Sequence, residues 1–365
     1  MGYGADVDDF RPGLEGVVAF ETEIAEPDRE GSALRYRGVD IEELVDRYPF
    51  EKVWGLLVDA AFDPGMPYAE RIEVQDTSGS VMADLQAGLA TLGSKWKLAQ
   101  LDDIDAKHAR DDLARLSAAA LSIVAQAARG SNEPPVPELT VHQGKNAAAQ
   151  FLIRWRGEAD PRHVRALDTY WVTAAEHGLN PSTFCARIVA STGADCASAL
   201  SAAVGALSGP LHGGAPTRVL KMLDDVEATG DADRYVRDLL ARGERIMGFG
   251  HRVYRAEDPR ARVLRRVAKE LGSPRVEVAD ALEQAARAAL QERSPDRVLE
   301  INVEFWAAVV LELAQVPPPM YPAMFACARV AGWSAHVVEQ RATGRLIRPS
   351  ARYVGPAAHN LTDAA

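Results

Sequence analysis

Residues 248–260 read GFGHRVYRAEDPR and combine two glycines, a histidine and a helix-start signal within one short stretch. The paired glycines permit a tight backbone path just before His251. Asp258 followed by Pro259 is typical of a helix N-cap with proline at the first helical position, which places Arg260 in the first turn. The stretch lacks the third glycine of a dinucleotide-binding loop, and no convincing strand precedes it. It therefore favours a loop between helices, suited to an anionic ligand, over a nucleotide-binding α/β fold.

Sequence patterns typical of helices cover most of the chain from about residue 110 onward, on both sides of this stretch. Apolar residues recur three or four apart, and the runs break at Gly or Pro. Asp160 and Asn180 each precede a proline and are predicted N-caps, with Phe184 and Ile188 starting a buried stripe after the second cap. Near the N-terminus, LRYRGVDIEELV predicts a short extended piece and then a helix capped by Asp40. Strands are otherwise hard to find, so the fold is predicted to be mostly α.

The composition indicates one folded unit of enzyme size. The 365 residues are 47% hydrophobic and 25% charged, and no linker rich in Ser or Gly divides them. A formal net charge of −11 argues against binding along a nucleic-acid backbone. Cys185, Cys196 and Cys327 are widely spaced among small or apolar residues, so we predict reduced, buried thiols. The N-terminus has neither a basic start nor an apolar run, and we expect a cytoplasmic protein that does not enter a membrane.

The stretch SGPLHGGAPTRVL places His212 between a Gly-Pro turn and a Gly-Gly pair, just before a helix predicted to begin near Pro216. If the imidazole faces that helix N-terminus, the partial positive charge there disfavours imidazolium. A neutral histidine can then donate a hydrogen bond to developing negative charge. The alternative is a turn histidine that is satisfied by backbone groups.

The stretch EINVEFWAAVVLEL carries Glu304 at the start of an apolar helix. Its neighbours Val303, Phe305 and Trp306 can desolvate the carboxylate and raise its pKa. The alternative is a glutamate that only complements the helix dipole.

Together, these three stretches resemble the citrate synthase family. The family pattern G-P-x-H-G is matched by residues 209–213, and its G-[FY]-G-H followed by D-P-R is matched by residues 248–260. Its catalytic base is an aspartate in N-V-D-F, whereas residues 302–305 here read NVEF. The resemblance covers nearly the whole chain except about residues 66–150. The short length and Glu304 look most like the smaller, second citrate synthases of actinobacteria.

The resemblance implies an all-α fold with a large helical domain, a smaller helical domain and a cleft between them. Residues 1–213 and 316–365 would form the large domain, and residues 214–315 the small one. The family needs no metal or cofactor, since acetyl-CoA is a substrate. The resemblance also implies a homodimer whose small domain closes when oxaloacetate binds.

The implied reaction condenses acetyl-CoA with oxaloacetate and water to give citrate and CoA through an enol. By motif match, Glu304 would remove a methyl proton from acetyl-CoA. His212 would hydrogen-bond the thioester oxygen, and His251 would polarise the ketone of oxaloacetate. This division of work agrees with the weak acidity of a thioester methyl group, which requires a base and a placed donor.

The two carboxylates of oxaloacetate suit planar guanidinium groups. The family's substrate arginines match Arg260, Arg329 and Arg348, of which Arg348 would reach the site of the neighbouring subunit. His177 matches the family's substrate-contacting histidine. Arg255 matches a position that meets the phosphates of CoA, although a solvated arginine is an equal alternative.

Three rival functions remain open on the sequence. A metal hydrolase would use His177, His212, His251 and Glu304 on zinc, but no pair has HxH or HExxH spacing. A 2-methylcitrate synthase would take propionyl-CoA, which differs by one methylene worth about 1–3 kcal/mol. A regulatory relative would bind oxaloacetate or CoA without turnover, a role that only Glu304 supports. His336 matches no catalytic position, and we predict that it is structural.

Overall fold

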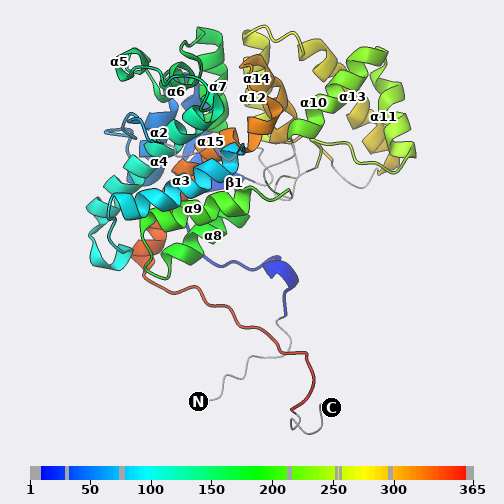
Figure 1. Cartoon of the computed structure of the whole chain (residues 1–365). Coiled ribbons are helices and arrows are strands. Elements are labelled where there is room, and N and C mark those ends of the chain that lie inside the picture. The colour runs from blue at the N-terminus through cyan, green and yellow to red at the C-terminus, as the bar shows by residue number, and fades with distance from the viewer. Residues whose placement is uncertain are drawn as a thin grey trace, which may run out of the picture.

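The structure is a computed structural model that describes residues 10–28, 33–73, 79–210, 212, 216–250, 254, 257–294 and 299–358. Helices dominate the described chain (Figure 1), which confirms the predicted all-α class. None of the helices in these ranges is long and apolar enough to cross a membrane.

The helices follow one another with short connections. The first nine are α1 (Ile41–Arg47), α2 (Phe50–Asp59), α3 (Val81–Lys95), α4 (Ala106–Arg129), α5 (Glu138–Val141), α6 (Ala147–Arg156), α7 (Pro161–Ala174), α8 (Pro181–Ala190) and α9 (Cys196–Leu207). The rest are α10 (Pro216–Thr229), α11 (Ala232–Ala241), α12 (Pro259–Glu270), α13 (Val276–Arg293), α14 (Val303–Leu313) and α15 (Tyr321–Thr343). The short 3-10 helices within the described ranges are η1 (Pro12–Leu14), η2 (Leu101–Asp103) and η3 (Pro318–Met320).

A small antiparallel sheet lies near the N-terminus. Its strands β1 (Ala25–Asp28), β2 (Ala33–Tyr36) and β3 (Val39–Asp40) pair in the order β1-β2-β3. The predicted extended piece is β2, and Asp40 caps α1 as expected by accepting from the Glu42 amide. The pairing with β1 and β3 was not predicted, because strands of two to four residues carry little alternation.

Local helix-start signals were read correctly. The side chains of Asp160, Asn180 and Asp258 each accept a backbone N–H in the first turn of α7, α8 and α12, with proline following each cap. Each cap satisfies a donor that the helix itself leaves unpaired.

The predicted buried stripe of α8 was wrong. Ile188 is 37% exposed and Phe184 is only partly buried, whereas Thr183 and Arg187 are buried. The helix packs against α9 and α15. Arg187 can be buried in this contact because it pairs there with Glu339 and Gln340 of α15. Of the three free thiols, Cys196 and Cys327 are buried as predicted, but Cys185 is only partly buried.

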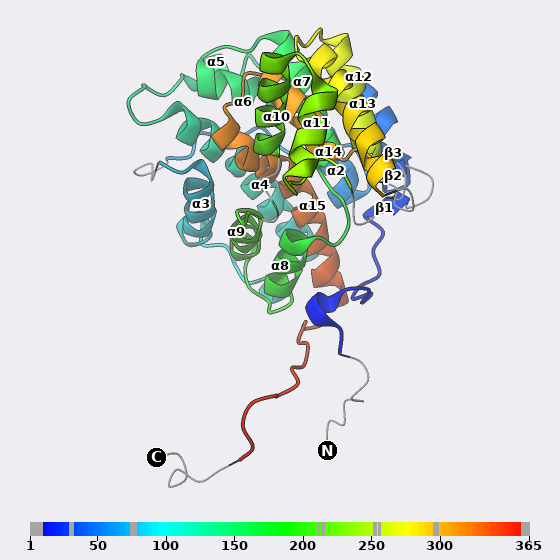
Figure 2. The same cartoon turned by 90° about the vertical axis from the view of Figure 1, so that its right-hand side faces the viewer.

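Helix α15 is the central element of the larger group of helices. Helices α2, α4, α7, α8 and α9 pack around it, as Figures 1 and 2 show. Met324 and Cys327 on one face are buried, but so are Arg329 and His336 on another. Polar groups on α15 are therefore enclosed by other helices.

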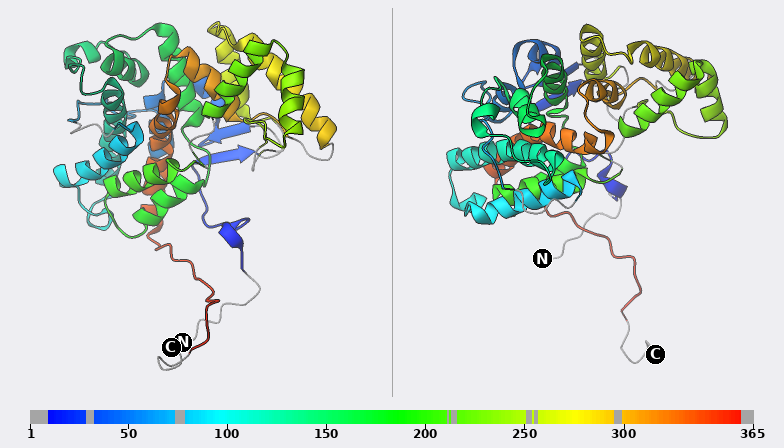
Figure 3. Two further views of the ribbon diagram at one scale, coloured as in Figure 1. Left: turned by 45° about the vertical axis from the view of Figure 1, so that its right-hand side comes forward. Right: turned by 45° about the horizontal axis from the view of Figure 1, so that its top comes forward.

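Helices α10 to α14 gather on one side of the molecule (Figure 3). Helices α10, α11 and α13 contact one another, while α12 and α14 also contact α7 of the larger group. Helices α12 and α14 thus lie where the two groups of helices meet. The division at residues 214 and 315 remains a prediction.

Candidate active site

The glycine-rich stretch is held against the start of α14 by backbone pairing. Phe249 and Ile301 form an isolated antiparallel bridge, and the Asn302 amide donates to the Gly248 carbonyl oxygen at 2.9 Å. Gly248 has a φ of +81°, and a Cβ there would lie 2.8 Å from the Phe305 Cβ. Only glycine satisfies both the backbone angle and the close approach. The pairing brings the chain just before His251 next to Asn302 and the first turn of α14.

One buried carboxylate joins the starts of α12 and α14. Asp258 Oδ1 accepts from the amide and Nε of Arg260, both at 3.0 Å. Its Oδ2 accepts from Arg260 at 2.8 Å and from the Val303 amide at 3.0 Å. Asp258 is fully buried and Arg260 is 4% exposed. The shared carboxylate fixes Arg260 close to Glu304, the second residue of α14.

The pKa of the Glu304 carboxyl is shifted toward neutral pH. Burial raises its pKa to about 7, Arg260 opposes this shift, and Asp258 adds to it. The predicted effect of apolar surroundings is therefore confirmed. Because its pKa lies near neutral pH, this carboxyl can accept a proton from a carbon acid and release it again.

The pKa of the His212 imidazole is shifted in the opposite direction, to a lower value. Burial and, to a smaller extent, the nearby Arg329 together lower its pKa to about 4. Its Nε2 lies 2.9 Å from Ser182 Oγ, and its ring meets Phe325 edge to face with centroids 5.9 Å apart. The predicted neutral histidine agrees with this shift, but its cause is burial and Arg329. The link from His212 to α10 falls outside the described residues.

Ser182 is a site residue that sequence reasoning missed. It is fully buried, accepts from Trp333 Nε1 at 3.1 Å, and lies within hydrogen-bond distance of Asn180 Oδ1. Because a hydroxyl has one proton and two lone pairs, its orientation decides which nitrogen of His212 carries the ring proton. The asparagine-proline-serine signal was interpreted only as a helix start.

Arg329 supplies a second buried cation. It is 1% exposed, its Nε donates to the Ala174 carbonyl oxygen at 2.9 Å, and its guanidinium lies 4.6 Å from the centre of the Phe325 ring. Among the residues that the structure describes, none accepts from its two terminal nitrogens. These nitrogens can therefore bind a carboxylate of a ligand.

His177 lies against the returning glycine-rich stretch. Its Nε2 is 3.0 Å from the hydroxyl of Tyr254, which is 5% exposed. Tyr254 was not selected from the sequence as a site residue, because nothing local reveals a partner 77 positions away. Arg260 also acts electrostatically on Tyr254, Glu304 and Arg329, so these groups share one neighbourhood.

The remaining three predicted site residues are His251, Arg255 and Arg348. His251 and Arg255 lie outside the described residues. Arg348 is exposed in the extended segment after α15, where the Ile347 amide donates to Ser191 Oγ. The described ranges contain no group of three His, Cys, Asp or Glu residues that could hold a metal ion.

Comparison with known proteins adds to this geometry. Residues 13–350 match the family model of the citrate synthase C-terminal domain. A protein of Mycobacterium tuberculosis with the provisional name citrate synthase 2 is 62% identical over 350 residues, which cover 96% of this chain and 94% of the relative. The chain belongs to the citrate synthase family. It is accordingly an enzyme of the acyltransferase type.

Other members of the citrate synthase family show the range of substrates. The 2-methylcitrate synthase of Shewanella oneidensis is 33% identical over 365 residues, which cover 94% of each chain. The citrate synthase of Thermoplasma acidophilum, solved with carboxymethyl-CoA and oxaloacetate, superimposes with a TM-score of 0.81 at 26% identity. That match covers 96% of this chain and 97% of the solved one, which confirms the predicted fold.

Proposed function

We propose that the enzyme condenses acetyl-CoA with oxaloacetate and water to give citrate and CoA. The observation that carries this proposal is the pair of opposite pKa shifts, to about 7 for Glu304 and to about 4 for His212. A thioester methyl group is a weak acid, so its deprotonation needs a nearby carboxylate and a neutral hydrogen-bond donor at the oxygen. Glu304 lies near the buried cation Arg260, and His212 lies near the buried cation Arg329.

The chemistry follows from these groups in order. Glu304 takes a methyl proton of acetyl-CoA, while neutral His212 donates a hydrogen bond to the thioester oxygen as negative charge develops there. The resulting enol carbon attacks the ketone carbon of oxaloacetate, and His251 would supply the proton to the ketone oxygen. Water then hydrolyses the citryl thioester and releases free CoA.

Oxaloacetate recognition would fall to Arg260, Arg329 and His177, with Arg348 from the second subunit of a homodimer. No residue that the structure describes accepts from the terminal nitrogens of Arg329, and this supports the role, since a guanidinium can hold a carboxylate through two parallel hydrogen bonds. Arg255 would meet the phosphates of CoA. Residues 214–315 would close over bound oxaloacetate and exclude water before proton transfer.

The direct test measures the release of free CoA thiol with oxaloacetate and either acetyl-CoA or propionyl-CoA. We expect the higher kcat/KM with acetyl-CoA. The 2-methylcitrate synthase relative makes propionyl-CoA the second candidate. A higher kcat/KM with propionyl-CoA would assign that activity instead, and binding of oxaloacetate without steady thiol release would indicate a regulatory protein.

Treatment with EDTA tests the rival metal-dependent chemistry. We expect turnover to stay within about twofold of the untreated enzyme, because the Nε2 atoms of His177 and His212 already have partners in Tyr254 and Ser182. Metal analysis of protein purified without added zinc is the companion measurement. Loss of turnover on chelation and recovery on adding zinc would contradict the proposed mechanism.

A further inference from the structure

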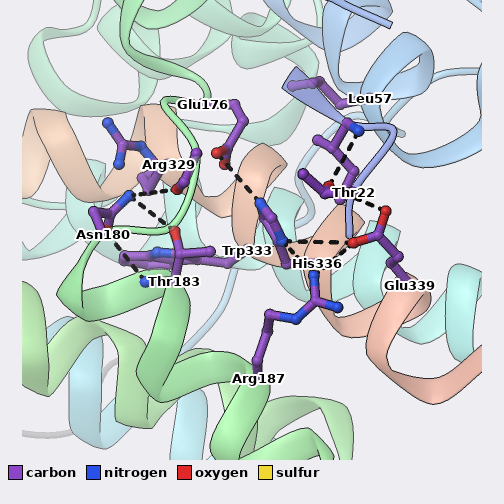
Figure 4. Close-up of polar contacts among 12 residues, drawn as sticks. Thr22, Leu57, Glu176, Asn180, Thr183, Arg187, Arg329, Trp333, His336 and Glu339 are labelled. Carbon is purple, nitrogen blue, oxygen red and sulfur yellow. Dashed lines mark hydrogen bonds and ion pairs between the residues drawn. The ribbon is translucent and has the colours of Figure 1, made fainter. Parts of the chain in front are cut away.

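A buried polar network lies directly behind Arg329 on helix α15 (Figure 4). Arg329, Gly332 and His336 are three and four positions apart and share one face of the helix. Glu176, the residue before His177, is fully buried against this face. A Cβ at Gly332 would lie only 2.0 Å from Glu176 Oε2. The glutamate carboxyl therefore occupies the space that the missing side chain at position 332 leaves.

The protonation state of His336 follows from its partners. Arg187 is 1% exposed, and its NH1 lies 2.8 Å from His336 Nδ1. A guanidinium only donates hydrogen bonds, so Nδ1 is the acceptor and a neutral ring carries its proton on Nε2. That nitrogen lies 3.3 Å from Glu176 Oε1 and donates to it. The positive charge of Arg187 is met by Glu339 at 2.6 Å.

The backbone of Glu176 is fixed as firmly as its side chain. Its amide donates to the hydroxyl of Tyr36 at 3.2 Å, and its carbonyl oxygen lies 3.1 Å from the same hydroxyl. Tyr36 is fully buried in β2. These hydrogen bonds therefore also restrain the backbone position of the next residue, His177.

Packing alone does not explain a carboxylate at this position. Glu176 Oε2 is buried and has no hydrogen-bond partner in the described chain. An unsatisfied buried oxygen is costly, and a glutamine would fill the same volume without a charge. Figure 4 shows the Glu176 side chain between His336 and Arg329. Burial lowers the pKa of Arg329, and Glu176 is the group that most opposes this shift.

We propose that Glu176 is a positioning residue for oxaloacetate recognition. Its oriented carboxylate balances the buried charge of Arg329 and fixes the chain that carries His177. Neutral His336 orients this carboxylate, and Arg187 sets the tautomer of His336. Glu176 acts through Arg329 and His177 and does not itself touch the substrate. The inference rests on the proposed function, because it assigns a role within oxaloacetate binding.

The test compares Glu176→Gln with the wild-type enzyme. We expect KM for oxaloacetate and its calorimetric Kd to rise about tenfold, since small misplacement of a recognition group is costly. KM for acetyl-CoA should change by less than about twofold. The melting temperature should fall as well, because the buried charge of Arg329 loses its counter-charge. A purely structural glutamate would lower the melting temperature but leave KM and Kd for oxaloacetate unchanged, so the oxaloacetate readouts decide.

Glu51→Gln is the matched control. Glu51 is also buried, at 6% exposure, and its Oε2 accepts from the Ala147 amide between α2 and α6. The same chemical change there should leave KM for oxaloacetate unaltered. Glu176→Asp keeps the charge but retracts it, and should raise KM for oxaloacetate by less than Glu176→Gln does.

The outcomes separate this inference from the proposed function. An active wild type with an unaltered oxaloacetate KM in Glu176→Gln would overturn the inference alone. A wild type that neither binds oxaloacetate nor releases thiol would contradict the proposed function itself. If Glu176→Gln does not fold, Glu176→Asp decides. A raised KM for oxaloacetate alone supports the positioning role, and unchanged KM values for both substrates overturn it.

Discussion

Glu304 stands where the family motif has aspartate, and its side chain is longer by one methylene group. That methylene moves the carboxylate by about 1.5 Å. The neighbouring Phe305 and Trp306 are fully buried, and Trp306 Nε1 donates to Glu283 Oε2 at 2.9 Å. These contacts fix the first turn of α14 around the longer side chain.

Glu304→Asp should therefore reduce activity. A misplacement of about 1 Å can cost on the order of 10²-fold in rate, and we expect a loss of about that size in kcat with oxaloacetate binding retained. Thiol release by the purified variant is the measurement. A gain in kcat would instead show a weakened family member whose site is still fitted to aspartate.

The raised pKa of Glu304 predicts two opposite dependences on pH. A base must be deprotonated, so kcat/KM for acetyl-CoA should rise through about pH 7 and then level off. The folded protein holds this proton more tightly than the unfolded chain does, so the contribution to stability is lost as pH rises from about 4.5 to about 7. Glu304→Gln should raise the free energy of unfolding at pH 8 by up to about 3 kcal/mol, and much less at pH 5. A flat rate profile between pH 6 and 8, or equal urea midpoints for wild type and variant at pH 8, would contradict this.

Sequence reasoning identified the residues of local motifs and missed their distant partners. His212 and Glu304 stand in short motifs, so both could be selected from the sequence. The low pKa of His212 depends on burial and on Arg329, more than one hundred positions away, so its cause could not be read locally. Ser182 and Glu176 were missed for the same reason, since Trp333 and His336 reach them from α15.

At the scale of elements, the turn at Gly248 connects the glycine-rich stretch to α14. Gly248→Ala would combine a φ of +81° with a contact of 2.8 Å to Phe305. We expect it to lower the free energy of unfolding by about 3 kcal/mol and to reduce kcat, because it moves the start of α14. Urea unfolding and thiol release measure the two effects.

Gly243→Ala is the matched control for that change. Gly243 has a similar φ of +74°, but a Cβ there meets nothing within 4 Å. The control should cost about 1 kcal/mol from the backbone angle alone and leave kcat unaltered. Equal losses in both variants would show that the contact with Phe305 is unimportant.

Helix starts were predictable, whereas burial of particular faces was not. Asp or Asn before proline is a local signal, and it located the starts of α7, α8 and α12. The buried face of α8 depends on Arg187 meeting Glu339 and Gln340 of α15, which no periodicity of α8 itself contains. Pairing of β1 with β2 likewise depends on tertiary contacts rather than on the two short strands alone.

At the scale of the whole molecule, the described segments before β1 and after α15 leave the helical body in the same direction (Figure 2). Arg348 lies on the C-terminal one and is exposed, away from the cluster around Arg329. In a homodimer, as the family resemblance implies, Arg348 would reach into the active site of the second subunit.

Mixed dimers test this sharing of residues between subunits. Arg348→Ala and His251→Ala should each be nearly inactive alone. Co-expressed with different tags, they should regain activity in the heterodimer, because one of its two sites then draws an intact His251 and an intact Arg348 from different chains. No recovery in a verified heterodimer would place Arg348 in the site of its own subunit or in none.

Glu304→Gln is the variant that shows whether Glu304 removes the methyl proton of acetyl-CoA. Deuterium exchange into the acetyl-CoA methyl group and citrate formation should be measured in the presence of oxaloacetate, with oxaloacetate affinity determined by calorimetry. We expect the variant to bind oxaloacetate with wild-type affinity, since His177 and the arginines remain, yet to lose both exchange and condensation. Near-normal turnover by Glu304→Gln would show that another group is the base.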